Sequence, residues 1–475
     1  MISVDVLPDD VPIAIFDQYV NGGDQHPINM AKEWQPLVHV CRRWRSIVFG
    51  SPRHLKLQLV CTKRTRARDM LDVWPALPLA IWCNRIGGVD NIIAALERRE
   101  RVCQIALWNV FSSDLGIYLE ALQQPFPELT NLLLHSANET VIPGIPSVPV
   151  VPDSFLGGSA PRMELLHLAG FPFPGLPELL LSAPHLTYLF LENIPHSGYI
   201  SPEAVVTALS SLISLQQLRL EFQSPRSCPD QASRRLPPST RSILLALTYF
   251  LFKGVSEYLE DLVGCIDAPL LNYLRITFFN DTAFDIPLFM QFISRTPTSR
   301  ALQKAHVKLS YGSADLDFSS QTSDYCSLKV RILCRGLEWQ VSSLEQVCTS
   351  CLPPLPTEDL YIYEHTYSQS DWRDDIESRP WLQLLHPFSA VKNLYLSERF
   401  ATCIGPALQE LAEGRTTEVL PALQNIFLEG LESSGPVQEG IAKFVAARQV
   451  ASRPIEVSSW ANSDRDKDYY YHSAL

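Results

Sequence analysis

A leucine-rich pattern that recurs along most of the chain is the feature that most constrains its fold. Runs of the form Leu-x-x-Leu-x-Leu, or variants with another apolar residue at a leucine position, extend from residue 77 to residue 428. From Ile105 onward, equivalent positions are separated by 23 to 34 residues. Alternating apolar positions within each run predict a half-buried β-strand. Recurrence at this period is typical of a repeat architecture in which each unit packs on its neighbours.

Each predicted strand is followed by an interval that can hold one helix. The strands are predicted at Leu77–Ile81, Val102–Leu107, Leu129–Leu134, Met163–Leu168, Leu186–Leu191, Leu215–Leu220, Leu247–Phe252, Leu271–Ile276, Val307–Leu309, Val330–Ile332, Leu360–Ile362, Val391–Leu396 and Leu423–Leu428. Helices are predicted at Val89–Val102, Ser201–Leu212, Ser256–Cys265, Ile286–Ile293, Ser342–Ser350 and Ala401–Ala412. This order predicts an α/β fold of the leucine-rich-repeat type, with a parallel sheet on the concave face and helices on the convex face. The match is irregular, because the asparagine expected beneath the strands occurs at Asn193 and in few other units.

The first 50 residues have a different, helical periodicity. One amphipathic helix is predicted around Val11, Ile15, Phe16, Tyr19 and Val20, and a second around Trp34, Leu37, Val38, Cys41, Trp44 and Val48. About 40 residues bury too little surface to fold alone. Their apolar face is also larger than two packed helices need, so we expect part of it to pack against something else.

These residues resemble an F-box. The resemblance lies in Leu7-Pro8, an acidic residue, Ile15-Phe16 and then Val40-Cys41-x-x-Trp44. It implies docking on a Skp-type adaptor within a Skp–cullin–F-box ubiquitin ligase. The adaptor-binding residues that it implies are Leu7, Pro8, Val11, Ile15, Phe16, Leu37, Val40, Cys41 and Trp44. One departure is the segment 21–27, which is longer than the usual helix join. The alternative interpretation is that these helices cap the structure that follows.

A wider resemblance extends over residues 7–460. The phrases 194–202, 278–280 and 391–396 are similar to a large group of fungal F-box proteins in which repeats follow the F-box. We therefore divide the chain into an F-box module (1–50), a connecting strand and linker (51–76), a leucine-rich-repeat-like solenoid with a C-terminal cap (77–460) and a disordered tail (461–475). The cap is a predicted helix at Pro436–Arg448 and a strand at Pro454–Val457. The insertions Thr140–Pro152, Gln223–Arg241 and Ser310–Ser323 are predicted to be loops.

Charge and cysteine content limit the classes of partner and the cellular compartments that we expect for this chain. The net charge of −12 argues against general nucleic-acid binding, which needs a basic surface. No secretory signal and no apolar run of about 18 residues is present, so no membrane segment is expected. Eleven cysteines without a signal peptide are best interpreted as reduced thiols in a cytoplasmic or nuclear protein.

We find no catalytic motif and predict no metal site and no cofactor. Cys348 and Cys351 form a single C-x-x-C, and structural zinc needs four ligands. His167, His185 and His306 are interpreted as partly buried structural residues. The acidic residues between 371 and 377 are interpreted as the solvated start of a helix.

Strand parity identifies candidates for substrate binding. If Ile362 points into the core, its neighbours on the strand point to the open face. The residues that this parity places there are Phe190, Arg219, Arg275, Arg331, Tyr361, Tyr363 and Tyr395. Aromatic residues and arginine dominate interaction hot spots. Ordinary alternation in a half-exposed strand is an equally good explanation of the same pattern.

The sequence therefore predicts a non-catalytic substrate receptor. The N-terminal helices would bind a Skp-type adaptor, and through it a cullin, while the solenoid binds an unidentified protein substrate. The alternative is a leucine-rich-repeat interaction scaffold without a role in a ubiquitin ligase. A third possibility, a hydrolase, would need a deep pocket with clustered titratable groups, of which the sequence gives no sign.

Overall fold

The computed structural model describes most of the chain as two compact units. The described residues are 7–21, 27–52, 55, 57–64, 67–84, 88–137, 149–227, 241–279, 286–297, 302–320, 327–351, 357–364, 378–412, 419–430 and 436–460. The first unit comprises residues 1–200 and 207–215, and the second comprises residues 201–206 and 216–475. The predicted disordered tail at 461–475 lies outside the described residues.

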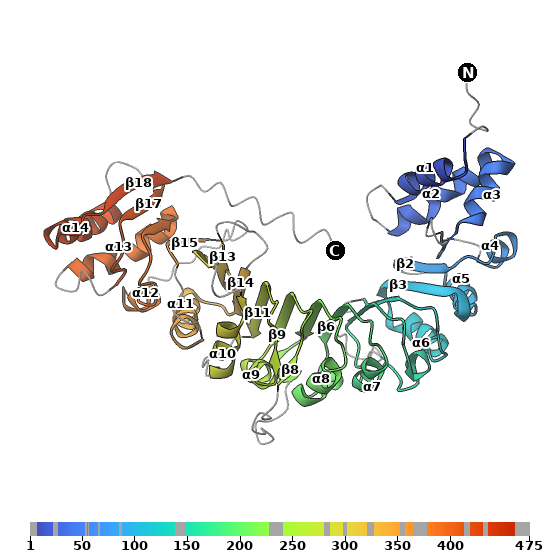
Figure 1. Ribbon diagram of the computed structural model, residues 1–475. Coiled ribbons are helices and arrows are strands. Elements are labelled where there is room, and N and C mark those ends of the chain that lie inside the picture. Colours follow the sequence, from blue (N-terminus) through green and yellow to red (C-terminus); the bar gives the residue numbers. More distant parts are fainter. Residues whose placement is uncertain are drawn as a thin grey trace. The chain divides into compact units, whose positions relative to one another are not determined.

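The first unit begins with helices and continues with alternating strands and helices (Figure 1). Its helices are α1 (Asp10–Asn21), α2 (Pro27–Val40), α3 (Arg42–Gly50), α4 (Ala67–Val73), α5 (Val89–Leu96), α6 (Ser112–Ala121) and α7 (Leu176–Leu181). Its strands are β1 (Leu59–Thr62), β2 (Leu79–Asn84), β3 (Val102–Val110), β4 (Asn131–Ser136), β5 (Leu165–Ala169) and β6 (Tyr188–Ile194). The helix α8 (Pro202–Leu209) is divided between the two units.

The strands of the first unit follow one another in chain order, and each pairs in parallel with the next. The leucine positions of the pattern align across the sheet: Ile105 is opposite Leu132, Leu132 opposite Leu166, and Leu166 opposite Leu189. These four side chains are at most 1% exposed. Burial of this row against the helices is what makes the repeats stack, since no single unit can cover its own apolar face.

The segment 51–76, predicted as a connecting strand and linker, contributes a strand and a helix to this sheet. β1 pairs with β2, with Cys61 opposite Ile81. This strand begins at Leu59 and ends at Thr62. α4 then follows β1 in the order found in the later units. The strand–helix alternation therefore starts about 20 residues earlier than predicted.

The second unit has the same alternation with one interruption (Figure 1). Its main strands are β7 (Gln217–Phe222), β9 (Tyr249–Gly254), β11 (Tyr273–Phe279), β12 (Lys304–Leu309), β13 (Ala314–Ser319), β14 (Ser327–Leu333), β15 (Asp359–Glu364), β16 (Asn393–Leu396), β17 (Asn425–Glu429) and β18 (Glu456–Trp460), with β8 (Ser242–Ile243) and β10 (Ile266–Asp267) forming a separate pair. Its helices are α9 (Ser256–Gly264), α10 (Pro287–Arg295), α11 (Leu337–Gln346), α12 (Ser378–Leu385), α13 (Glu398–Ala412) and α14 (Pro436–Val450).

In each unit the main strands belong to a parallel-dominated sheet. In the second unit, the order is β7-β9-β11-β14-β13-β12-β15-β16-β17-β18. The helices α9 to α13 pack on one face of this part of the sheet, and the other face carries no helix among the described residues. The predicted α/β class, with a parallel sheet and helices in leucine-rich-repeat-like order, is confirmed.

One predicted loop is wrong. Residues 310–323 contain the strand β13, which is antiparallel to both β12 and β14 and separates them in the sheet. Ala314, Leu316 and Phe318 are buried on one side of β13. The two intervening aspartates lie on the other side, where cations on the neighbouring strands neutralise them. Because the segment is rich in small and acidic residues, the alternation of apolar and polar positions in β13 was not recognised from the sequence.

The asparagine ladder appears in another place than predicted. Asn193 has a positive φ of 51° at the end of β6 and carries no side-chain ladder. At the start of β15, β16 and β17, however, the Asn393 amide donates to Asp359 at 2.7 Å, and the Asn425 amide donates to Asn393 at 2.8 Å. This chain of side-chain hydrogen bonds fixes the register of three adjacent strands.

Candidate functional site

The N-terminal module contains three helices where the sequence predicted two. α2 ends at Val40, and Cys41 is extended, with φ −156° and ψ 171°. The Cys41 sulfur accepts a hydrogen bond from the Trp44 backbone N–H at 3.4 Å, so Cys41 caps the N-terminus of α3. The single predicted helix through Cys41 is therefore wrong. The chain turns there, and the turn leaves Val40 and Cys41 exposed.

Seven of the nine residues predicted to bind an adaptor reach the surface of this module. They are Leu7 and Trp44, which are half-buried, and Pro8, Val11, Ile15, Val40 and Cys41, which are exposed. On α1, Val11, Ile15 and Tyr19 are 40%, 56% and 51% exposed. Because they recur every four residues, they form a single apolar stripe along the helix. We call Val11, Ile15 and Tyr19 the α1 stripe.

The other two predicted residues, Phe16 and Leu37, belong to the core of the module. Their exposures are 1% and 7%. Phe16 packs against Trp44 with ring centroids 4.8 Å apart and an interplanar angle of 59°. A partner cannot touch side chains that are covered in this way. The prediction that Phe16 and Leu37 contact an adaptor is therefore wrong. Both side chains pack beneath the exposed residues of the module.

Arginines on α3 fix the segment that precedes α1. The Arg43 guanidinium donates to the Leu7 carbonyl oxygen and forms an ion pair with Asp9 at 2.9 Å. Arg45 Nε donates to the Val38 carbonyl oxygen at 3.0 Å. These bonds hold Leu7 beside α3 and hold α3 against the end of α2.

Another part of the module is attached to the repeats of its own chain. Trp34 Nε1 donates to the Gln58 carbonyl oxygen at 2.9 Å, just before β1. The Trp34 ring, 1% exposed, contacts Phe49 at 5.9 Å and Trp74 at 5.3 Å between centroids. Trp34, Leu37 and Val38 of α2 are thus covered internally. The α1 stripe is not covered by any described part of the chain.

The helix-free face of the first unit carries an aromatic and histidine cluster. The rings of Trp108 and His135 are 4.1 Å apart, those of His135 and His167 also 4.1 Å, and those of His167 and Phe190 5.4 Å. His167 Nε2 lies 3.1 Å from a Glu192 carboxylate oxygen. Of these residues, only Phe190 was predicted to bind a substrate. Three histidines were predicted to be partly buried: His167 and His306 are buried at least in part, whereas His185 is exposed.

The same face of the second unit carries a ladder of stacked rings. His306 stacks on Tyr361 at 4.5 Å, Tyr361 on Tyr395 at 4.2 Å, and Tyr395 on Phe427 at 4.4 Å, all with interplanar angles below 10°. Trp460 contacts Tyr361 and Tyr395 at 5.9 and 5.6 Å. We call His306, Tyr361, Tyr395 and Phe427 the aromatic ladder. Register alignment of the strands positions these rings, since each is directly opposite the next.

Tyr363 is placed differently from the prediction. It is 7% exposed, its hydroxyl lies 3.3 Å from His306 Nδ1, and Lys308 Nζ lies 5.9 Å from its ring centroid. Tyr363 therefore packs against His306 of the aromatic ladder, and its buried ring is not available to a ligand. His306, Phe427 and Trp460 were missed, although the parity rule that selected Tyr361 also applies to His306 and Phe427 once the register is known.

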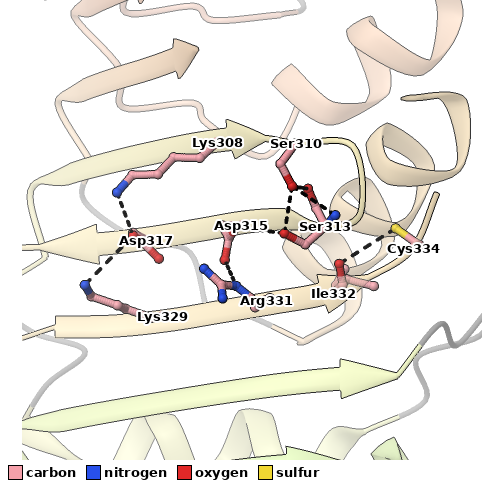
Figure 2. A network of polar contacts seen from close by, with 9 residues as sticks. All are labelled: Lys308, Ser310, Ser313, Asp315, Asp317, Lys329, Arg331, Ile332 and Cys334. Atoms are coloured by element: carbon pink, nitrogen blue, oxygen red, sulfur yellow. Dashed lines mark hydrogen bonds and ion pairs between the residues drawn. The ribbon is translucent and has the colours of Figure 1, made fainter. Parts of the chain in front are cut away.

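Inserted strand β13 brings two aspartates into a row of cations (Figure 2). Asp317 lies 3.2 Å from Lys308 Nζ and 4.0 Å from Lys329 Nζ, and Asp315 is paired with Arg331. Burial raises the pKa of Asp315, and the Arg331 guanidinium opposes this rise. The predicted binding candidate Arg331 is thus engaged within its own sheet.

The other two predicted arginines lie close to tyrosines. Tyr249 and Tyr273 stack with centroids 4.5 Å apart and planes at 6°. Burial raises the pKa of both phenols, while the positive charges of Arg219 and Arg275 lower it. Together with Lys329 on β14, these arginines form one row across the helix-free face. We call Arg219, Arg275 and Lys329 the basic strip.

Several cysteines are chemically inactive at neutral pH. Burial raises the pKa of Cys61, Cys103 and Cys334 to about 11, so these thiols stay protonated. Cys348, from the C-x-x-C, is buried in a π-helical turn, Val347–Cys351. No group of three or more His, Cys, Asp or Glu suited to a metal ion occurs among the described residues, and the acidic residues between 371 and 377 lie outside them. Within the same part of the chain, no helix is long and apolar enough to cross a membrane.

Comparison with known proteins gives a similarity to a solved structure. No family model matches the chain, and no curated protein matches it. Among solved structures, the leucine-rich repeat-containing protein LegL7 from Legionella pneumophila is similar over 69% of this chain and 93% of its own length, with 13% sequence identity and a TM-score of 0.27. A likeness at this TM-score carries no argument, and the fold assignment rests on the strand order and register described above.

Proposed function

We propose that this chain is the substrate-recognition subunit of a Skp–cullin–F-box type ubiquitin ligase. In this proposal the N-terminal helices bind a Skp-type adaptor, which connects the chain to a cullin. The helix-free sheet faces bind a protein substrate. The chain itself supplies no transfer chemistry; it acts by holding the substrate close to the subunit that does.

The α1 stripe is the observation that carries this proposal. Soluble proteins seldom leave several neighbouring apolar side chains exposed without a partner to cover them. Here Ile15 and Tyr19 are both more than half exposed, and Val40 at the end of α2 is 59% exposed. These side chains belong to the residues that resemble an F-box or, in the case of Tyr19, lie on the same helix face. A standard interface buries about 800 Å² on each partner, which a module of three helices can supply.

The sheet faces support the substrate-binding part of the proposal. The aromatic ladder contains two tyrosines and the basic strip two arginines, and both residue types are enriched at interaction hot spots. They lie on strands and not on loops, so their relative positions are fixed by register before any ligand arrives.

An interaction scaffold without a ligase role is the second candidate. The ladder and the strip favour it equally, because both would bind a protein whether or not an adaptor is present. The two candidates differ only in the function of the α1 stripe, which the scaffold would use as a cap or for a different partner.

Co-expression with a Skp-type adaptor separates the two. The full chain carrying an affinity tag should retain the adaptor through size-exclusion chromatography in equal molar amount. The variant Ile15→Asp, which places a charge in the α1 stripe, should lose it while eluting at the volume of the unbound wild-type chain. A wild-type chain that elutes without the adaptor favours the scaffold.

A further inference from the structure

The basic strip places like charges next to each other in the sheet. In the aligned register, Arg219 is opposite Leu251, Leu251 opposite Arg275, and Arg275 opposite Lys329. Like charges on directly opposed residues destabilise a sheet. The opposition of Arg275 and Lys329 is therefore unfavourable for the fold, and an anionic ligand that reaches both residues would relieve the repulsion.

The carboxylates nearby do not balance these cations. Arg219 Nε lies 3.8 Å from Glu221, and Lys329 shares Asp317 with Lys308, at 4.0 and 3.2 Å. Among the described residues, no carboxylate forms an ion pair with Arg275, whose positive charge lowers the pKa of the Tyr273 phenol.

The surrounding face has the same excess of positive charge. Two adjacent rows, one through Arg275 and one through Arg331, cross β7, β9, β11, β14, β13 and β12. Together these two rows carry six cations, namely Arg219, Lys253, Arg275, Lys308, Lys329 and Arg331, and three carboxylates, namely Glu221, Asp315 and Asp317. The chain as a whole has a net charge of −12. A local excess of three positive charges on an acidic protein is therefore a distinct electrostatic feature that attracts an anionic partner.

The row continues from the basic strip into the aromatic ladder. Lys329 is opposite Asp317, Asp317 opposite His306, and His306 opposite Tyr361. Neighbouring strands are about 4.8 Å apart, so Arg275 and Tyr361, four strands apart, are separated by about 19 Å, the length of about six extended residues. One extended segment laid across the strands can therefore reach both.

We propose that this row binds an acidic protein segment whose carboxylates contact the basic strip and whose apolar side chains, about six residues away, contact the aromatic ladder. Arginine guanidinium groups can contact carboxylates in a bidentate way, which favours an acidic ligand at Arg219 and Arg275. The segment is a part of the substrate only if the proposed function holds. Its binding site, however, does not depend on the adaptor.

Fluorescence anisotropy with two labelled peptides tests this directly on the full chain. The first peptide has four glutamates followed, six residues later, by phenylalanine and leucine; in the second, glutamines replace the glutamates. The first should bind with an affinity that falls as salt rises, and the second should bind at least tenfold more weakly. Equal affinity for the two peptides, or no binding of the first at 1 mM, overturns the proposal.

Three variants connect binding to the strip. Arg275→Gln and Lys329→Gln should each weaken binding of the acidic peptide about five- to tenfold. Lys443→Gln removes the same charge from the outer helix α14, where Lys443 is half-exposed, and should leave binding unchanged. Because Arg275→Gln also relieves the repulsion with Lys329, its melting temperature should be equal to or above that of the wild type. A loss of binding accompanied by a lower melting temperature would indicate a structural role and would contradict the proposal.

Two further measurements distinguish a protein ligand from RNA, and the acidic-segment site from the adaptor site. Single-stranded RNA of equal charge should compete poorly; an RNA that binds tighter than the peptide and depends on Arg275 would overturn the choice of a protein ligand. Adaptor retention by Arg275→Gln should match the wild type. Loss of adaptor binding by the wild type with peptide binding intact would refute the ligase role and leave the acidic-segment site standing.

Discussion

Ile15 and Phe16 are neighbours in sequence and opposite in burial: the Ile15 side chain is 56% exposed, and Phe16 is 1% exposed. Phe16 fills the space beside Trp44 in the core of the N-terminal module. Ile15 belongs to the α1 stripe and contacts no covering element among the described residues. Substitutions at Phe16 therefore test the stability of the module, and substitutions at Ile15 test its capacity to bind an adaptor.

Substitution of Phe16 by alanine should destabilise the module strongly. Truncation of a buried phenylalanine leaves a cavity and costs about 3–5 kcal/mol, whereas Ile15→Ala at the surface should change stability by less than about 0.5 kcal/mol. Denaturant unfolding followed by tryptophan fluorescence measures both. Similar midpoints for the two variants would contradict the assignment of Phe16 to the core.

Cys41 should be protected from alkylation by the adaptor. It is the exposed cysteine among the described thiols, while Cys61, Cys83, Cys265, Cys334 and Cys348 are buried. Iodoacetamide under native conditions, with the modified site identified by mass spectrometry, should label Cys41 in the isolated chain and label it far more slowly in the adaptor complex. An unchanged labelling rate in a complex shown to be intact would place the interface elsewhere.

The aromatic ladder should contribute to stability according to the number of stacked neighbours. Tyr395 stacks on two rings, whereas Phe427 at the end of the ladder stacks on one. An aromatic pair contributes about 0.5–1.5 kcal/mol beyond its buried area. Tyr395→Leu should therefore lower the free energy of unfolding about twice as much as Phe427→Leu. Equal losses would show that the rings act independently.

Stability should depend on pH through Asp315. Burial raises its pKa in the folded state, so the folded protein binds that proton more tightly than the unfolded chain does. This contribution stabilises the fold at low pH and is lost as the pH rises through the folded-state pKa. The stability of the wild type relative to Asp315→Asn should consequently fall as the pH is raised from about 4 toward neutrality. A relative stability that grows over this range would show that pairing with Arg331 outweighs burial.

Much of the fold was predictable because the leucine pattern reports burial directly. The runs ending at Leu134, Leu191 and Leu396 each coincide with a strand, and the leucines at their alternating pattern positions face the core. The repeat around Val307 was the weakest: the predicted strand is present as part of β12, but its alignment with the other repeats was wrong. Ala305 and not Val307 is aligned with the leucine position of β15, and the added strand β13 follows.

The candidate site was less predictable because it depends on register and on turns. Parity within β15 placed Tyr361 and Tyr363 on one face, but only the neighbouring strand shows that Lys308 and His306 cover Tyr363. In the same way, the periodicity of residues 34–48 is continuous through Cys41, so nothing in it signals that the backbone turns there. The residues predicted from the resemblance to an F-box include both surface and core positions, because a sequence motif does not distinguish residues that bind a partner from residues that stabilise the helices.

Calorimetric titration of the full chain with a purified Skp-type adaptor tests the central claim most directly. The wild type should bind with one-to-one stoichiometry. Ile15→Asp should weaken binding at least tenfold, since a hot-spot substitution costs about 2 kcal/mol or more. The matched control Leu181→Asp alters a side chain of similar exposure, 53%, on the repeat helix α7, and should bind as the wild type does. Adaptor binding that is absent in the wild type, or equal in Ile15→Asp and Leu181→Asp, would contradict the account.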